Sequence, residues 1–173
     1  MYHHSIIKLI WYIHINLIIE PVLDFLWTQN LPLKIACFTW LLARGRILTW
    51  DQLQNIGFQG PSRCVLCERN EEDIYHLFFV CPFTVCILAH FAAKYGFSFP
   101  FYNTVPSFLA QWFSSFARSA PFRYLPLFIF WGIWLLRNNF LFENRKPYFY
   151  ALISRVEGFL NSYPAPLKIQ KIQ

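Results

Sequence analysis

Acidic residues are scarce in this chain of 173 residues, and their scarcity excludes a large class of enzymes. Only three aspartates are present, Asp24, Asp51 and Asp73, and no two of them are adjacent. Polymerases and ribonucleases that use two metal ions hold those ions with clustered carboxylates. Neither a glycine-rich phosphate loop with its lysine nor a serine in a nucleophile elbow occurs in the sequence. We therefore expect a protein that is not an enzyme and that has no small-molecule substrate.

Long apolar runs and a secretion signal are lacking as well. The two most apolar stretches, residues 6–19 and 125–136, are shorter than the roughly 18 to 20 residues that a membrane span needs. No signal peptide with a small-residue cleavage site opens the chain, and five cysteines, an odd number, do not suit a secreted disulfide framework. These features favour an intracellular protein of the nucleus or cytoplasm, with a membrane location as the lesser alternative.

Aromatic residues are abundant, at 21% of the chain against 14% charged residues, which predicts apolar faces that meet another surface. Proline and glycine punctuate helical periodicity throughout. We therefore expect a mainly α-helical protein of about six or seven helices, with any hairpin confined to the turn between Cys64 and Cys67. After a short helical piece at residues 22–27, the main helices are expected near residues 32–44, 49–56, 71–80, 82–95, 104–116, 125–142 and 147–160.

Two of these helices have features that a structure can test directly. Thr49 is a natural N-cap, and Gln52 stands three residues later, as in a capping box. The helix at 125–142 is apolar almost all round except for the polar residues 137–139, so it is expected to be central or to be covered by a partner.

The strongest pattern is a set of three cysteines and one histidine. Cys64 and Cys67 are separated by two residues, eight residues lead from Cys67 to His76, and four more lead to Cys81. A tight turn brings the two sulfurs of a Cys-x2-Cys pair to one metal, and Cys3His is a tetrahedral zinc set. All four positions would be filled by protein, which predicts one structural zinc ion and no open position for water or substrate.

Other uses of these residues are weighed against the zinc interpretation. Cysteine behaves as a small apolar residue, so each of the four could be part of a core or a disulfide. The charged residues 68–73 between the two halves indicate an exposed loop, which suits a metal site better than a core. Cys86 and His90, four residues apart, could be further ligands or a nucleophile pair, but apolar neighbours favour a structural role for both.

A wider pattern surrounds these ligands from about Trp27 to Phe91. It comprises Trp27, Leu31 to Lys34, Phe38 to Trp40, Arg46, Thr49, Leu53, Cys64, Cys67, Glu72, His76 to Phe79, Cys81 and Pro82. This pattern resembles the zinc-binding region that follows the polymerase of plant LINE-type, non-LTR retroelements. Further on, Trp131-Gly-Ile-Trp134 with Arg137-Asn138 is similar to the segment that lies between that region and a ribonuclease H domain.

The resemblance implies a small helical domain with a Cys-Cys-His-Cys zinc knuckle and further apolar helices C-terminal to it. It assigns Cys64, Cys67, His76 and Cys81 as the ligands, in agreement with their spacing. We accordingly divide the chain into an unassigned extension at 1–20, the zinc-binding domain at 21–97, a helical extension at 98–163 and a basic tail at 164–173. The function it implies is a non-catalytic, retrotransposon-derived module that helps a reverse transcriptase to hold nucleic acid.

Basic residues near the knuckle suggest how such a module could meet its partner. Five of them are candidates for contact with the phosphates of RNA or DNA: Lys34, Arg44, Arg46, Arg63 and Arg69. Solvated charges on short helices explain the same residues equally well. The alternatives to nucleic acid are a reverse transcriptase or ribonuclease H module in trans, a protein-interaction role for the helix near Trp131 and Trp134, and an inactive remnant.

Overall fold

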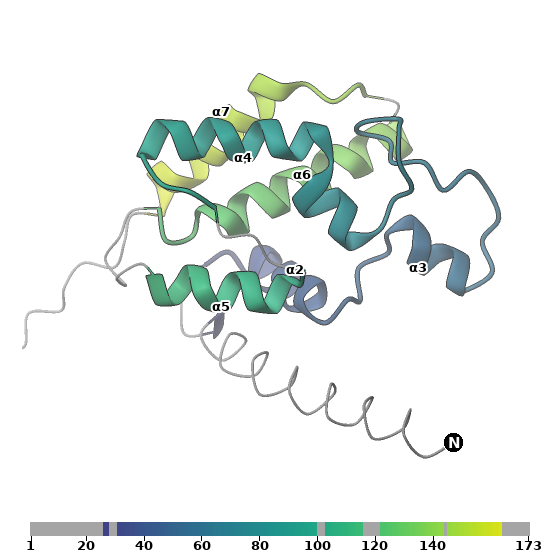
Figure 1. Cartoon of the computed structure of the whole chain (residues 1–173), viewed down its shortest axis with the longest axis horizontal. Coiled ribbons are helices and arrows are strands. Elements are labelled where there is room, and N and C mark those ends of the chain that lie inside the picture. Colours follow the sequence, from purple (N-terminus) through teal and green to yellow (C-terminus); the bar gives the residue numbers. More distant parts are fainter. Residues whose placement is uncertain (1–25, 28–30, 100–102, 116–121, 144, 164–173) are drawn as a thin grey trace, which may run out of the picture.

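The computed structural model describes residues 26–27, 31–99, 103–115, 122–143 and 145–163 (Figure 1). Several predicted segments lie outside the described residues: the extension at 1–20, most of the helical piece at 22–27, and the tail at 164–173. The described helices are α2 (Leu33–Ala43), α3 (Trp50–Asn55), the π-helix η1 (His76–Val80), α4 (Pro82–Tyr95), α5 (Val105–Ser115), α6 (Leu125–Glu143) and α7 (Phe149–Ser162).

The predicted fold class is confirmed, because the described residues are mainly helical and form no strand longer than one bridge. Several helix ends follow the proline and glycine signals. Pro32 precedes α2 and Pro82 is the first residue of α4. The α4 helix ends at Gly96, whose φ of 71° is left-handed and whose N–H donates to the carbonyl of Ala92. Glycine adopts this conformation without steric cost, which explains the stop.

The predicted capping box of α3 is wrong in its side-chain contact. Thr49 is the N-cap residue, but its side chain makes no capping bond and its buried hydroxyl has no hydrogen-bond partner. The backbone N–H of Trp50 instead donates to the Glu72 carboxylate at 3.0 Å. A tertiary contact has therefore replaced the local cap. Gln52, the second residue of the predicted capping box, donates instead to the neighbouring Asp51 at 2.9 Å.

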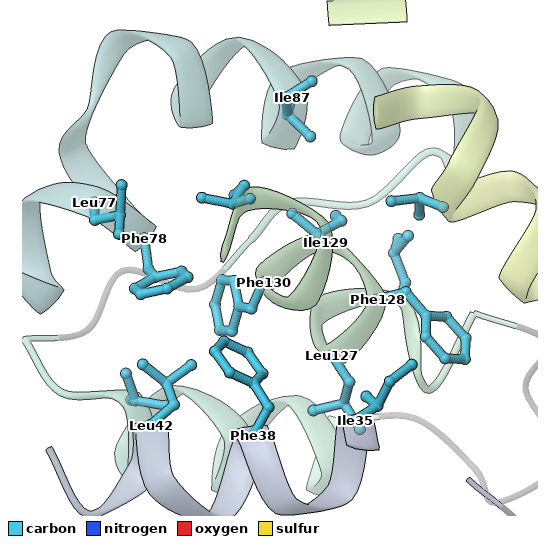
Figure 2. Packing of buried hydrophobic residues seen from close by; sticks show 14 of the residues in the cluster. Ile35, Phe38, Leu42, Leu77, Phe78, Ile87, Leu127, Phe128, Ile129 and Phe130 are labelled. Atoms are coloured by element: carbon cyan, nitrogen blue, oxygen red, sulfur yellow. The ribbon is translucent and has the colours of Figure 1, made fainter. Parts of the chain in front are cut away.

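Helix α6 is the centre of the core. Ten of its nineteen residues are buried, with α4 and α7 on one side and α2 and α5 on the other (Figure 1). Figure 2 shows Phe130 of α6 beside Phe78 of η1 and Phe38 of α2. The Phe78 and Phe130 rings meet edge to face at a centroid distance of 5.3 Å, an arrangement that aromatic pairs prefer.

Among the described helices, α6 is the one whose length and apolar composition would allow it to cross a membrane. In this structure 56% of its apolar window is buried inside the protein. More than half of this apolar window therefore packs inside the core, in agreement with the prediction of a central helix.

A close contact between α6 and α7 depends on Gly132. A Cβ atom at this position would lie 2.2 Å from Cδ1 of Leu152, which is itself only 1% exposed and has little room to move. We expect Gly132→Ala to lower the free energy of unfolding by about 1 to 3 kcal/mol through overpacking. Urea unfolding of both proteins measures this difference.

Gly158→Ala provides the matched control within α7. Gly158 is exposed, and a Cβ there would meet nothing within 4 Å. Because alanine is the better helix former, this variant should gain up to about 1 kcal/mol. Equal stability changes in the two variants would contradict the packing argument.

Candidate metal centre

Four side chains converge at one end of the helical body. The ligand atoms of Cys64, Cys67, His76 and Cys81 all lie within 4.8 Å of one another. The Cys64 and Cys81 sulfurs are 3.9 Å apart, and the Cys67 sulfur is 3.3 Å from Nε2 of His76. Cys67 is half-buried and the other three are buried, so the cluster is largely shielded from water.

The first two ligands lie on a short hairpin. The N–H of Cys64 donates to the carbonyl of Asn70, and the N–H of Glu72 donates to the carbonyl of Ser62, on either side of a single antiparallel bridge. The chain reverses where the N–H of Glu68 donates to the carbonyl of Cys64, with Glu68 at a φ of 57°. The prediction that any hairpin is confined to the turn between Cys64 and Cys67 is therefore wrong, because the hairpin extends from Ser62 to Glu72 through the pairing of its two arms.

The other two ligands lie at the two ends of η1. Asp73 immediately precedes the helical stretch that runs from residue 74 into η1, and its carboxylate accepts from the N–H of His76 at 2.6 Å. The N–H of Cys81 then donates to the carbonyl of His76, five residues back, at 2.7 Å. In an α-helix, residues i and i+5 point in directions about 140° apart around the helix axis. A π-helical turn is wider and bonds residue i to residue i+5, so His76 and Cys81 lie one above the other, about one turn apart. The π-helix, which the sequence analysis missed, therefore brings both ligands to the same side.

The pKa values of Cys64 and Cys81 are shifted in opposite directions by their contact with each other. The pKa of Cys81 is lowered by its contact with the Cys64 thiol, and the backbone N–H groups of Thr84 and Phe83 at the start of α4 act in the same direction. The pKa of Cys64 is raised by the same contact and by burial. Burial also lowers the pKa of His76 and favours its neutral, metal-binding form.

These four residues fit a zinc ion. Tetrahedral zinc, with bonds of about 2.3 Å to sulfur and 2.0 to 2.1 Å to nitrogen, would place its ligand atoms roughly 3.5 to 3.8 Å apart. Two of the separations, 3.9 Å and 3.3 Å, are close to that range, and all of them lie within 4.8 Å. Three thiols and one imidazole would complete the tetrahedron without water, so the cluster suits one structural zinc ion.

The remaining cysteines and His90 are not part of this cluster. Cys37 and Cys86 are exposed on α2 and α4. The ring of His90 packs edge to face against Phe91 at 5.2 Å and Phe149 at 6.1 Å. His90 thus packs among aromatic side chains.

The five predicted basic residues are all exposed, but they do not form one compact group. Arg63 and Arg69 lie on the hairpin, close in sequence to the ligands. Lys34 and Arg44 lie at opposite ends of α2, about 15 Å apart along its axis. The guanidinium of Arg44 lies over the Trp40 ring, 4.7 Å from its centroid.

The fold and the cluster together define a helical module with a Cys3His site suited to structural zinc. Residues 6–87 match the family model described as zinc-binding in reverse transcriptase, and all four clustered residues lie within the match. That family is a zinc-binding domain and not a catalytic one. Comparison with curated proteins and with solved structures gives no match. The match begins within residues 1–20, which we left unassigned, and ends before residue 97, the predicted end of the zinc-binding domain. The predicted domain limits therefore stay a prediction.

The affinity for zinc should rise with pH. In the metal-free protein the raised pKa keeps a proton on Cys64, and zinc must displace it in order to bind the thiolate. Each displaced proton makes the dissociation constant fall about tenfold per pH unit. Competition with a chromophoric chelator between pH 6 and pH 8, corrected for the chelator's own protonation, measures the slope. A flat profile would contradict this account of the centre.

Proposed function

We propose that this chain is a non-catalytic, structural zinc-binding module of a retroelement-derived protein associated with a reverse transcriptase. Its zinc ligands are Cys64, Cys67, His76 and Cys81. The observation that carries the proposal is that these four side chains converge within 4.8 Å, inside the segment that matches a reverse transcriptase zinc-binding family. The resemblance to plant LINE-type, non-LTR elements supports the finer assignment of the element class.

The zinc ion would act by holding a weakly packed segment to the helical body. Helix α3 has no buried residue, and the hairpin has a single bridge. The metal joins this hairpin to η1 and to the start of α4, which belong to the core. A hairpin held in this way presents Arg63 and Arg69 at a fixed place on the surface. We propose that this surface, together with the exposed Arg44 and Arg46 that follow α2, assists the binding of RNA or DNA by the associated polymerase.

Protein interaction is the second candidate function, and the exposed apolar side chains favour it. Leu33, Ile56, Phe58 and Phe142 are between 58% and 81% exposed. The partner would be a reverse transcriptase or ribonuclease H module in trans. Trp131 and Trp134 are poor anchors for it, because both rings pack against Phe38 within the chain. A third alternative is a remnant that retains the zinc fold without binding nucleic acid.

The ligand assignment predicts the metal content of single variants. Cys64→Ser, Cys67→Ser, His76→Ala and Cys81→Ser should each lower zinc below one ion per chain, since each removes one of four donors. Cys37→Ser and Cys86→Ser are the controls and should retain one ion. Elemental analysis of the purified proteins measures the ratio. Loss of zinc in Cys86→Ser with retention in Cys81→Ser would show that the assignment is wrong.

The nucleic-acid proposal predicts the effect of reversing charge near the knuckle. Changing Arg44, Arg46 and Arg63 together to glutamate should weaken binding of a labelled RNA or DNA strand and reduce its salt dependence, because up to about three phosphate contacts are lost. Fluorescence anisotropy over a range of salt concentrations measures both effects.

The matched control carries the same charge change elsewhere on the chain. Arg145, Lys146 and Arg155 are exposed near the end of α6 and on α7, and changing these three to glutamate should leave the affinity closer to that of the unmodified protein. Zinc content should stay at one ion in both triple variants. Equal affinities in the two variants would favour the protein-interaction function.

A further inference from the structure

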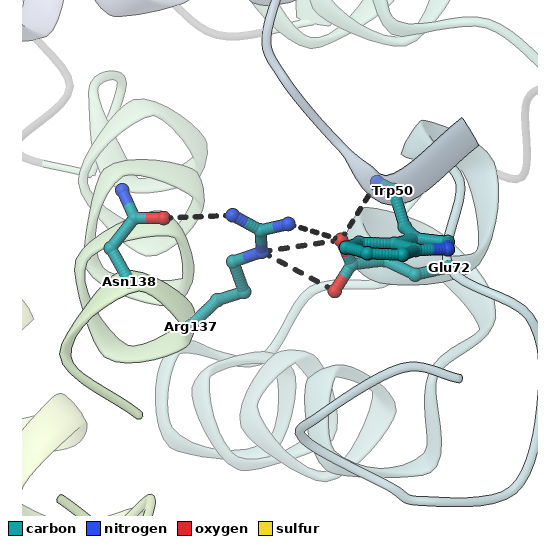
Figure 3. A network of polar contacts seen from close by, with 4 residues as sticks. All are labelled: Trp50, Glu72, Arg137 and Asn138. Atoms are coloured by element: carbon teal, nitrogen blue, oxygen red, sulfur yellow. Dashed lines mark hydrogen bonds and ion pairs between the residues drawn. The ribbon is translucent and has the colours of Figure 1, made fainter. Parts of the chain in front are cut away.

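A buried carboxylate connects three parts of the chain that are distant in sequence. Glu72 lies in the loop between the second and third predicted zinc ligands, and it accepts hydrogen bonds from Arg137 of α6 at 2.7 Å, 3.2 Å and 3.3 Å (Figure 3). The same carboxylate accepts from the backbone N–H of Trp50 at the start of α3. Glu72 and Arg137 are only 2% and 3% exposed. This is a buried ion pair between residues 65 positions apart.

The backbone of Glu72 is also hydrogen-bonded, through both its N–H and its carbonyl. Its N–H donates to the carbonyl of Ser62 on the opposite arm of the zinc hairpin, at 2.7 Å. Its carbonyl accepts from the N–H of Asp51 in α3 at 3.3 Å. The position of the carboxylate therefore depends on the conformation of the loop that carries the zinc ligands.

The α6 side of the contact uses the Trp-x2-Trp and Arg-Asn pattern noted in the sequence. The Arg137 guanidinium lies 5.1 Å from the centroid of the Trp134 ring and donates to the side-chain oxygen of Asn138 at 3.0 Å. Trp131 and Trp134 both pack on Phe38 of α2, at 5.3 Å and 6.0 Å. One stretch of α6 thus contacts the core helix α2 and positions Arg137 against Glu72.

Because both charges are buried, the structure is stable only when Glu72 and Arg137 are paired with each other. A charged group that is removed from water needs a partner, because an unpaired buried charge is strongly unfavourable. Arg137 can remain buried only while Glu72 is in place, and Glu72 is in place only while the hairpin keeps its form. Anything that orders the hairpin therefore favours docking of α6, and by thermodynamic reciprocity docked α6 favours the ordered hairpin.

We propose that Glu72 and Arg137 are positioning residues of the metal site, which couple zinc binding to the docking of α6 and α7. This inference rests on the proposed zinc ligands. Zinc orders the hairpin, the ordered hairpin presents Glu72 to Arg137, and the ion pair holds α6 with the α7 helix packed against it. The unit that binds zinc then includes helices that lie beyond the matched segment, residues 6–87.

Hydrogen exchange on the full chain tests the coupling directly. Exchange is measured by mass spectrometry with one equivalent of zinc and again after zinc is removed with EDTA. Faster exchange after removal is expected in residues 62–80, which carry the ligands, and also in residues 125–162. Faster exchange in 62–80 alone would overturn the coupling and leave the zinc module intact. No zinc-dependent change anywhere would overturn the proposed zinc function, and the coupling with it.

A single substitution with a matched control tests the ion pair. Arg137→Met removes the buried cation, and the zinc dissociation constant should rise by at least about fivefold, because coupling between two sites typically changes an affinity by about 5- to 150-fold. Arg145→Met makes the same chemical change at an exposed arginine that pairs locally with Glu143. It should leave the dissociation constant unchanged. Equal values for the two variants would overturn the proposed role of Arg137.

A double variant keeps the test decisive if Arg137→Met fails to fold. Glu72→Leu with Arg137→Met leaves no buried charge unpaired, and such exchanges of a buried pair for apolar residues are commonly tolerated. In this protein zinc should still slow exchange in residues 62–80, but exchange in residues 125–162 should no longer respond to zinc. An unchanged response of 125–162 would show that the coupling does not pass through Glu72 and Arg137.

Discussion

The convergence of Cys64, Cys67, His76 and Cys81 on one point is the constraint on which the segment from Ser62 to Pro82 depends. Within this segment η1 belongs to the core, whereas the hairpin has one bridge and buries few apolar side chains, and the preceding helix α3 has no buried residue. Ordering a residue costs conformational entropy, and a segment with few apolar contacts must recover that cost elsewhere. A structural metal supplies it, because the free energy of metal binding becomes free energy of folding.

The helical body depends on a different interaction, the packing of aromatic rings. Phe79, Phe108 and Phe130 contact one another at centroid distances of 5.4 to 5.6 Å, and Phe78 also meets Phe130. Much of the high aromatic content is therefore used within the chain. The body and the metal segment meet at η1, where His76 faces the metal centre while Leu77 and Phe78 belong to the core. A displacement of this short helix would disturb both.

The sequence predicted those features that follow from local rules. The mainly helical fold follows from proline and glycine at positions such as Pro82 and Gly96, and the metal cluster follows from ligand spacing. The π-helix was missed because the four residues between His76 and Cys81 are compatible with both α-helical and π-helical hydrogen bonding, and the sequence does not distinguish the two. Thr49 is the N-cap residue as predicted, but the predicted side-chain bond of its capping box was wrong, because a carboxylate more than twenty residues away accepts from the N–H of Trp50 instead. Such a tertiary partner cannot be seen from spacing alone.

Arg137 shows why a matched segment and a folding unit can have different ends. In the sequence this residue looked like a polar interruption of an apolar helix, yet it is buried against Glu72, 65 positions earlier. Phe38 and Phe78 also lie within the matched residues 6–87, and they are buried in part because α6 covers them. A sequence pattern ends where its characteristic residues end, whereas a folding unit ends where buried surface and buried charge have found their partners. By that physical criterion the zinc-binding unit that we propose continues through α6.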